Sequence, residues 1–226
     1  MLPEPAAPKS LADPAALAAR RALVGAPHLA PVRALARIIA AERDAPVPDP
    51  DPLDGGAEAR MLLLLETPGP AIFKTGFVSR DNATGTAANL FRFLAEAGIA
   101  RRDTLIWNTI PWVIHPEGAL NRAPRRAEMT AAIPYLAPLL ACLPRLAVVA
   151  LSGRFAAGLG PALADLRPGL PVVALPHPSP TYVCTSPEVA TRIRAGLAEA
   201  ARLLRAVPAA DHRACPQPGK SATSTG

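Results

Sequence analysis

Residues 61–69 read Met-Leu-Leu-Leu-Leu-Glu-Thr-Pro-Gly, and this stretch decides the fold. The five apolar residues Met61–Leu65 form a run that is typical of a strand covered on both faces. Polar residues and a Pro-Gly pair follow directly, which indicates that the strand ends in a turn. Strands covered on both faces belong to parallel sheets that lie between two layers of helices.

Three more apolar runs of similar length follow along the chain, at Thr104–Trp107, Leu146–Leu151 and Pro171–Leu175. Segments with helical apolar spacing separate or follow these runs, at Thr86–Ala97, Arg125–Leu143, Phe155–Leu159 and Pro187–Leu204. Pro134 and Pro138 must kink or break the second of these helices. The alternation of strands and helices predicts an α/β fold, a three-layer α/β/α sandwich around a central four-stranded parallel sheet.

The segments before and after this pattern differ in composition. Leu11–Val24 and Leu29–Arg43 have helical apolar spacing, whereas Asp44–Gly56 alternates prolines with polar residues and is typical of a linker. We therefore expect N-terminal helices with a Pro-rich linker over residues 1–56 and the α/β domain over 57–207. Residues 208–226 are polar and rich in Pro, Gly and Ser, and we expect them to form a disordered tail.

The chain has 226 residues and a net charge of +6, and its basic residues are arginines except for Lys9, Lys74 and Lys220. Arginine suits bidentate contacts to phosphate, although this charge by itself leaves a polyanion partner open. No apolar run reaches the ~20 residues that a membrane helix needs, and the N-terminus lacks the pattern of a signal peptide. We expect a monomeric cytoplasmic protein without a membrane partner.

Polar side chains follow each of the four predicted strands. Glu66, Asn108, Ser152 and His177 come at or just after the strand ends. Because ligands of parallel sheets bind outside the carboxyl ends of the strands, we expect these side chains to share one rim. A carboxylate, a carboxamide and an imidazole on one rim suit a site that holds a small polar ring and charges one of its atoms.

Four short motifs occur in order along the chain. They are Glu66-Thr67-Pro68-Gly69; Gly76-Phe77-Val78 with the following Gly85–Leu94; Leu105-Ile106-Trp107-Asn108; and His177-Pro178-Ser179-Pro180. Together they resemble the motifs of the uracil-DNA glycosylase superfamily, in its bacterial branches, over roughly residues 60–204. The resemblance does not extend to the first 55 residues.

The resemblance implies a DNA glycosylase that hydrolyses the N-glycosidic bond of uracil or a related deaminated base during base excision repair. His177 would donate a hydrogen bond to a carbonyl oxygen of the departing base and so stabilise its negative charge. Asn108 would pair with the amide edge of a pyrimidine, which rejects bases with the reversed pattern. Phe77 would stack on the extruded base, with Phe73 as its rival for that role.

The best-known branch of the superfamily has an aspartate just before the proline of the first motif, where this chain has Thr67. A threonine cannot act as a base at neutral pH, so Glu66 and Asp81 are the candidates to assist the attacking water. Thr67, Pro68, Gly69 and Ser179, with Ser152-Gly153, lie in turns small enough to approach the flipped nucleotide closely.

Several features are weaker guides to DNA contact. Enzymes that extrude a base usually fill the gap with an apolar wedge, and Tyr182 and Val183 are the candidates here. Four arginines either line a DNA groove or are simply solvated: Arg80, Arg122, Arg125 and Arg126. One branch of the superfamily holds an iron–sulfur cluster on four cysteines. The three scattered cysteines of this chain, without a CxxC pair, cannot supply one, so we expect no metal or other cofactor.

Two other functions remain open at this point. The chain can be a DNA-binding or base-sensing protein that has the fold without the chemistry, which the threonine at position 67 favours. It can also be a small-molecule enzyme on a similar scaffold, such as a nucleoside hydrolase or an esterase. The absence of a Gly-x-Ser-x-Gly motif and of an aspartate cluster suited to calcium argues against this last class.

Overall fold

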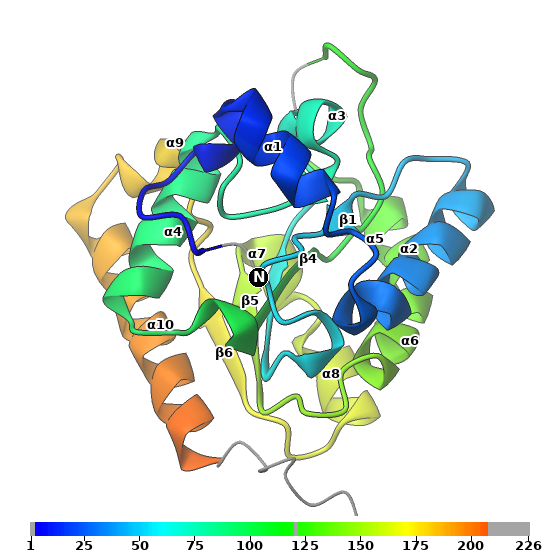
Figure 1. Cartoon of the computed structure of the whole chain (residues 1–226). Helices are drawn as coiled ribbons and strands as arrows, with labels where there is room; N and C mark the ends of the chain where they lie inside the picture. The colour runs from blue at the N-terminus through cyan, green and yellow to red at the C-terminus, as the bar shows by residue number, and fades with distance from the viewer. Residues whose placement is uncertain (1–2, 120–121, 208–226) are drawn as a thin grey trace, which may run out of the picture.

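A four-stranded parallel sheet forms the centre of the computed structural model, which describes residues 3–119 and 122–207. The strand order is β4-β2-β5-β6, with β2 at Met61–Leu65, β4 at Thr104–Asn108, β5 at Val148–Ser152 and β6 at Val172–Leu175 (Figure 1). These bounds confirm the four predicted strands to within two residues. The chain passes from β2 to β4 on one side and returns to β5 on the other, which opens a crevice at the carboxyl end of β2.

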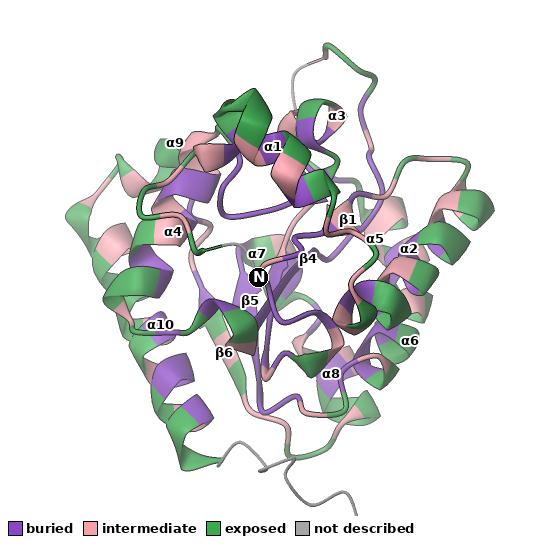
Figure 2. Ribbon diagram, in the orientation of Figure 1, coloured by how far each residue is buried: buried purple, intermediate pink, exposed green. Residues whose placement is uncertain are grey.

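Helices cover both faces of the sheet, because successive residues of each buried strand point to opposite sides. Leu62, Leu64 and Trp107 face a core formed with α2 (Ala30–Arg43), α5 (Arg126–Ala132), α6 (Leu136–Ala141) and α8 (Gly160–Leu166). Leu63 and Ile106 face a second core formed with α4 (Gly85–Glu96) and α10 (Pro187–Ala206). The predicted three-layer α/β/α sandwich is confirmed, and Figure 2 shows the buried strands β4 and β5 between helices that are partly exposed.

The remaining elements are short. They are η1 (Ser10–Ala12), α1 (Pro14–Arg21), η2 (Pro27–Leu29), β1 (Asp49–Pro50), η3 (Gly56–Glu58), α3 (Ala71–Thr75), β3 (Phe77–Val78), η4 (Arg101–Asp103), η5 (Ile133–Tyr135), α7 (Arg154–Ala157) and α9 (Pro180–Val183). The helix expected over 125–143 breaks into α5, η5 and α6. The break falls at Pro134, whose ring and missing N–H interrupt the helical ladder, whereas Pro138 lies within α6.

The N-terminal segment packs directly on the α/β core. α2 buries Val32, Leu35 and Ile39 in the first core. Leu11 and Leu17 form a third, smaller core with Phe77. β1 also pairs in parallel with β3, so that Asp49 lies opposite Phe77. The residues upstream of position 56 therefore contact the same loops that lead into the crevice.

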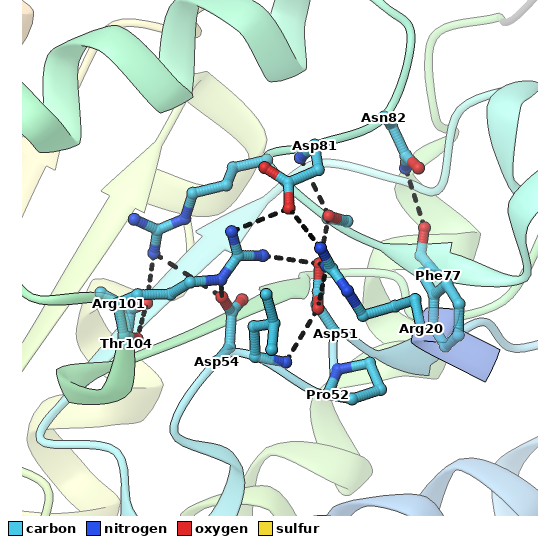
Figure 3. Close-up of polar contacts among 12 residues, drawn as sticks. Arg20, Asp51, Pro52, Asp54, Phe77, Asp81, Asn82, Arg101 and Thr104 are labelled. Atoms are coloured by element: carbon cyan, nitrogen blue, oxygen red, sulfur yellow. Dashed lines mark hydrogen bonds and ion pairs between the residues drawn. The ribbon is translucent and has the colours of Figure 1, made fainter. Parts of the chain in front are cut away.

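Asp51 and Asp54 are buried, which differs from the exposed linker that composition predicts for residues 44–56. Figure 3 shows why: their carboxylates lie beside the guanidinium groups of Arg20 and Arg101. Arg80 also pairs with Asp54. Burial of a carboxylate requires such partners, and composition does not reveal them. The tail predicted for residues 208–226 lies outside the described residues.

Candidate active site

A cavity of about 260 Å³ lies at the carboxyl ends of β2 and β4. Seven of the predicted site residues line it: Glu66, Thr67, Pro68, Gly69, Phe77, Asn108 and His177. These residues come from three different strand ends and from β3, so Glu66, Asn108 and His177 share the expected rim. Ser152, at the end of β5, is fully buried and does not line the cavity. Asp81 and Ser179 do not line the cavity, whereas Ser79, Asn82, Thr84, Thr86 and Arg122 do.

The Asn108 carboxamide lies at the last residue of β4, opposite Leu65 in the neighbouring strand. The residue is 3% exposed, yet no group in residues 3–119 or 122–207 hydrogen-bonds its side chain. Its oxygen and its NH₂ group therefore remain available to a ligand in the cavity. A carboxamide in this state matches a ligand edge that presents one acceptor beside one donor.

The His177 ring is held in one tautomer by its own loop. The backbone N–H of Ser179 donates to His177 Nδ1 at 3.2 Å, so in the neutral ring the hydrogen lies on Nε2. Burial lowers the pKa of His177 to about 4, so the imidazole is neutral at pH 7. Ser179, predicted to contact the substrate, instead orients the imidazole through its backbone.

Glu66 lies between the cavity and α7. Burial raises the pKa of its carboxyl group above the ordinary value, although the backbone N–H of Phe155 and the charge of Arg154 act in the opposite direction. Gly153 packs against this carboxylate: a Cβ atom there would lie 2.7 Å from Glu66 Oε1 and 3.3 Å from His177 Cβ. Glu66 therefore anchors the turn after β5 while it also lines the cavity.

Asp81 does not reach the cavity, which corrects its prediction as a candidate base. It is fully buried, and its Oδ2 accepts from Arg20 at 2.9 Å and from Arg101 at 2.8 Å (Figure 3). Two ion pairs and no access to solvent keep this carboxylate from an attacking water. The neighbouring Asn82 faces the cavity instead.

Phe77 lines the cavity and also packs in the third hydrophobic core. It is 2% exposed, lines the cavity, and packs on its other side against Leu11 and Leu17. The rival Phe73 does not line the cavity and instead makes an edge-to-face contact with His115, with ring centroids 5.8 Å apart. The position of Phe77 is therefore fixed by the N-terminal segment.

Sequence reasoning gave no role to Asn82, which lines the cavity, or to His115, which does not line it but contacts the Pro68-Gly69 turn. Asn82 donates from Nδ2 to the Phe77 carbonyl at 2.9 Å, and its buried Oδ1 has no partner among the described residues. His115 Nε2 lies 3.2 Å from the carbonyl oxygen of Pro68 and Nδ1 lies 3.3 Å from that of Pro116, so the tautomer with hydrogen on Nε2 donates to the Pro68-Gly69 turn. Asn82 adjoins the predicted Asp81, but no motif marks His115.

The remaining candidates for DNA contact differ in whether their side chains are exposed. Tyr182 is 50% exposed, with its ring centroid 6.5 Å from that of His177, whereas Val183 packs on the core beneath α4 and α10. Arg80 is buried and donates to Thr104 Oγ1, so it does not line a groove. Arg122 lines the cavity but is paired with Glu128. The side chains of Arg125 and Arg126 are exposed.

The described parts of the chain contain neither a metal-binding cluster nor a membrane-spanning helix. Within 3–119 and 122–207, no group of three or more His, Cys, Asp or Glu side chains is placed to hold a metal ion. None of the helices described there has the length and apolar character needed to cross a bilayer.

Comparison with known families gave one result that bears on this cavity. The model of the uracil DNA glycosylase superfamily matches residues 54–198, which is more than half of the chain and includes every residue that lines the cavity. A comparison with curated proteins gave no match.

Proposed function

Because the chain belongs to the uracil DNA glycosylase superfamily, whose members act on DNA, we propose that it hydrolyses the N-glycosidic bond of uracil or a related deaminated base. The base enters the cavity at the ends of β2 and β4 after it is extruded from the DNA. Its release leaves an abasic site, which makes the reaction the first step of base excision repair. We also propose that a monomer acts in the cytoplasm.

The neutral imidazole of His177 is the observation that carries this proposal. As the glycosidic bond breaks, the base gains negative charge and the sugar becomes cationic. An Nε2–H donor that is fixed by Ser179 and needs no reorientation stabilises that anion. Removal of one such preorganised donor costs about 3–4 kcal/mol of transition-state stabilisation in comparable sites.

The free carboxamide of Asn108 selects the base. Its NH₂ group donates to a carbonyl oxygen of uracil, and its oxygen accepts from the ring N–H. Cytosine presents the reverse pattern at this edge, so its groups and those of Asn108 would be left unpaired in a buried site. Phe77 forms the wall of the cavity against which the base lies.

Glu66 is the remaining carboxylate at the cavity, since Asp81 is engaged in buried ion pairs. The carboxylate lines the cavity, so one of its oxygens can accept a hydrogen from the attacking water. The raised pKa of the carboxyl group makes it a better base at neutral pH than an exposed glutamate.

The proposal is tested with a uracil-containing oligonucleotide, with abasic sites scored as alkali-labile strand breaks. Wild-type protein should release uracil, and His177→Ala should reduce the single-turnover rate by about 10²–10³-fold. His28→Ala, which removes an imidazole outside the cavity, is the matched control and should retain the rate. Equal product from wild-type and His177→Ala protein would contradict the proposal.

A base-sensing protein without hydrolysis is the second candidate function. It is favoured by Thr67, which occupies the place of the usual acid and lines the cavity. This function predicts tight, salt-sensitive binding of uracil-containing DNA with no release of the base.

A further inference from the structure

A second hollow, of about 290 Å³, adjoins the base cavity. Glu66 and His177 line both hollows and form the wall between them. The other walls of the second hollow come from the edge strand β6 and from α7, α9 and α10, the group of elements around the far edge of the sheet in Figure 1. None of the functions assigned above uses this space.

The hollow suits a flat, apolar group. Tyr182 on α9 and Val189 on α10 line it, together with Ala174 and Leu175 of β6. The Tyr182 ring is half-exposed, and its centroid lies 6.5 Å from that of the His177 ring, so part of the ring is accessible to a stacking partner. An aromatic ring that enters this hollow exchanges water for aromatic and aliphatic contact.

Two cations lie at the edge of the same hollow. Arg154 on α7 and Arg192 on α10 line it. The charge of Arg154 also acts on the Glu66 carboxylate, which lines the same hollow. Arg194, two residues further along α10, pairs with Glu96 at 2.7 Å and lies over the Phe93 ring. Two guanidinium groups from separate elements suit a phosphate.

A flat ring that carries a phosphate is a nucleotide, and the nucleotides that flank the extruded one are its nearest neighbours along the strand. We propose that the second hollow binds one flanking nucleotide, with its base against Tyr182 and its phosphate at Arg154 and Arg192. This inference rests on the proposed function, because it takes the adjoining cavity to hold the extruded base. Glu66 and His177 line both hollows, so the extruded base and the flanking nucleotide would be separated only by these side chains.

This inference predicts whether single-stranded or duplex DNA is the preferred substrate. A base that stacks on Tyr182 is unpaired, so the preferred substrate is single-stranded DNA or DNA with an unpaired flank. This role differs from that of a wedge, since a wedge fills the gap in a duplex from which a base has left.

The test uses single-stranded oligonucleotides with one uracil, in which the 5′ or the 3′ neighbour is either a normal nucleotide or a tetrahydrofuran abasic residue. Loss of the base on one side should raise KM about fivefold, the lower end of the range for base–aromatic stacking. Tyr182→Ala should raise KM for the normal oligonucleotide equally and should abolish the difference between the two substrates.

The phosphate contact is tested through salt dependence. Arg192→Gln should reduce the slope of log K against log salt by about 0.7 for single-stranded DNA. Arg205→Gln is the matched control: it removes the same charge from the same helix about 20 Å away, and it should leave the slope unchanged.

Equal KM values for normal and abasic flanks in the wild type would overturn the inference. It would also be overturned if Tyr182→Ala impaired excision from duplex DNA alone, which is the result that a wedge predicts. Uracil release by the wild type reports on the proposed function separately. If no uracil is released, the same oligonucleotides still test the hollow through Kd measured by fluorescence anisotropy.

Discussion

Gly153 provides the sharpest test of the site geometry, because a methyl group at this position would contact both Glu66 and His177, the two residues between the hollows. Its φ of 98° and ψ of 168° lie in a region that is essentially restricted to glycine. A Cβ atom would stand 2.7 Å from Glu66 Oε1, about 0.7 Å inside the 3.4 Å limit of ordinary contact. Gly153→Ala therefore strains the backbone and displaces either the turn or Glu66.

Backbone strain of this kind amounts to about 1–3 kcal/mol, so we expect Gly153→Ala to lower the free energy of unfolding by about 2 kcal/mol. For a domain of this size that corresponds to a fall in Tm of roughly 4–8 °C. Misplacement by 1 Å near a reacting centre reduces rates about 10²-fold, so a displacement of about 0.7 Å should reduce uracil excision by roughly 10–100-fold.

Thermal unfolding followed by circular dichroism and single-turnover excision below Tm measure the two effects. Gly160→Ala is the matched control, because a Cβ at the first residue of α8 meets no atom within 4 Å. That change should raise stability slightly or leave it unchanged, and it should leave excision intact. If Gly153→Ala behaves like Gly160→Ala, the assigned packing of the wall is wrong.

Three further predictions follow from charges. Because burial lowers the pKa of His177 to about 4, the unfolded protein binds a proton at this ring below about pH 6.5, whereas the folded protein does so only near pH 4. The free energy of unfolding should therefore fall as the pH is lowered from 6.5 toward 4. ¹⁵N NMR at pH 6 should show a neutral ring with its hydrogen on Nε2. Arg20→Met removes a cation from the buried carboxylates of Asp51 and Asp81, so it should lower the free energy of unfolding in urea titrations by about 3–5 kcal/mol. Arg21→Met, at the exposed neighbouring position, is the control and should change it by less than ~1 kcal/mol. Glu66→Gln should slow excision at least ~10²-fold and remove the acid limb of its pH profile, and a loss below tenfold would leave the residue only an anchor.

The strands and layers were predictable because burial on both faces leaves a direct mark on composition. Met61–Leu65 and Leu105–Trp107 are unbroken apolar runs, and the polar residues that follow them, Glu66 and Asn108, meet at one rim because parallel strands share a direction. The break at Pro134 follows equally from local chemistry. In each case the deciding property belongs to a few consecutive residues.

The errors concern residues whose environment is set by distant partners. Asp51 and Asp81 are polar residues in turns, and only the fold reveals that Arg20 and Arg101, far away in the sequence, surround them. The tautomer of the His177 ring likewise depends on a backbone N–H that a motif does not specify. Ion pairs between segments that are distant in the sequence leave no periodic pattern in it. For this reason the partners of Asp51 and Asp81 could not be predicted.

The buried ion pairs also connect the N-terminal segment to the proposed chemistry. The superfamily match begins at residue 54, yet Arg20 from α1 binds Asp81, and the backbone N–H of Leu11 donates to the Asp81 carbonyl at 3.1 Å. Asp81 adjoins Asn82, which lines the base cavity and is tied to the Phe77 carbonyl. The first 50 residues thus hold one wall of a cavity whose polar groups all lie within the matched region. Substitutions in α1 should consequently act on the cavity through the position of this wall.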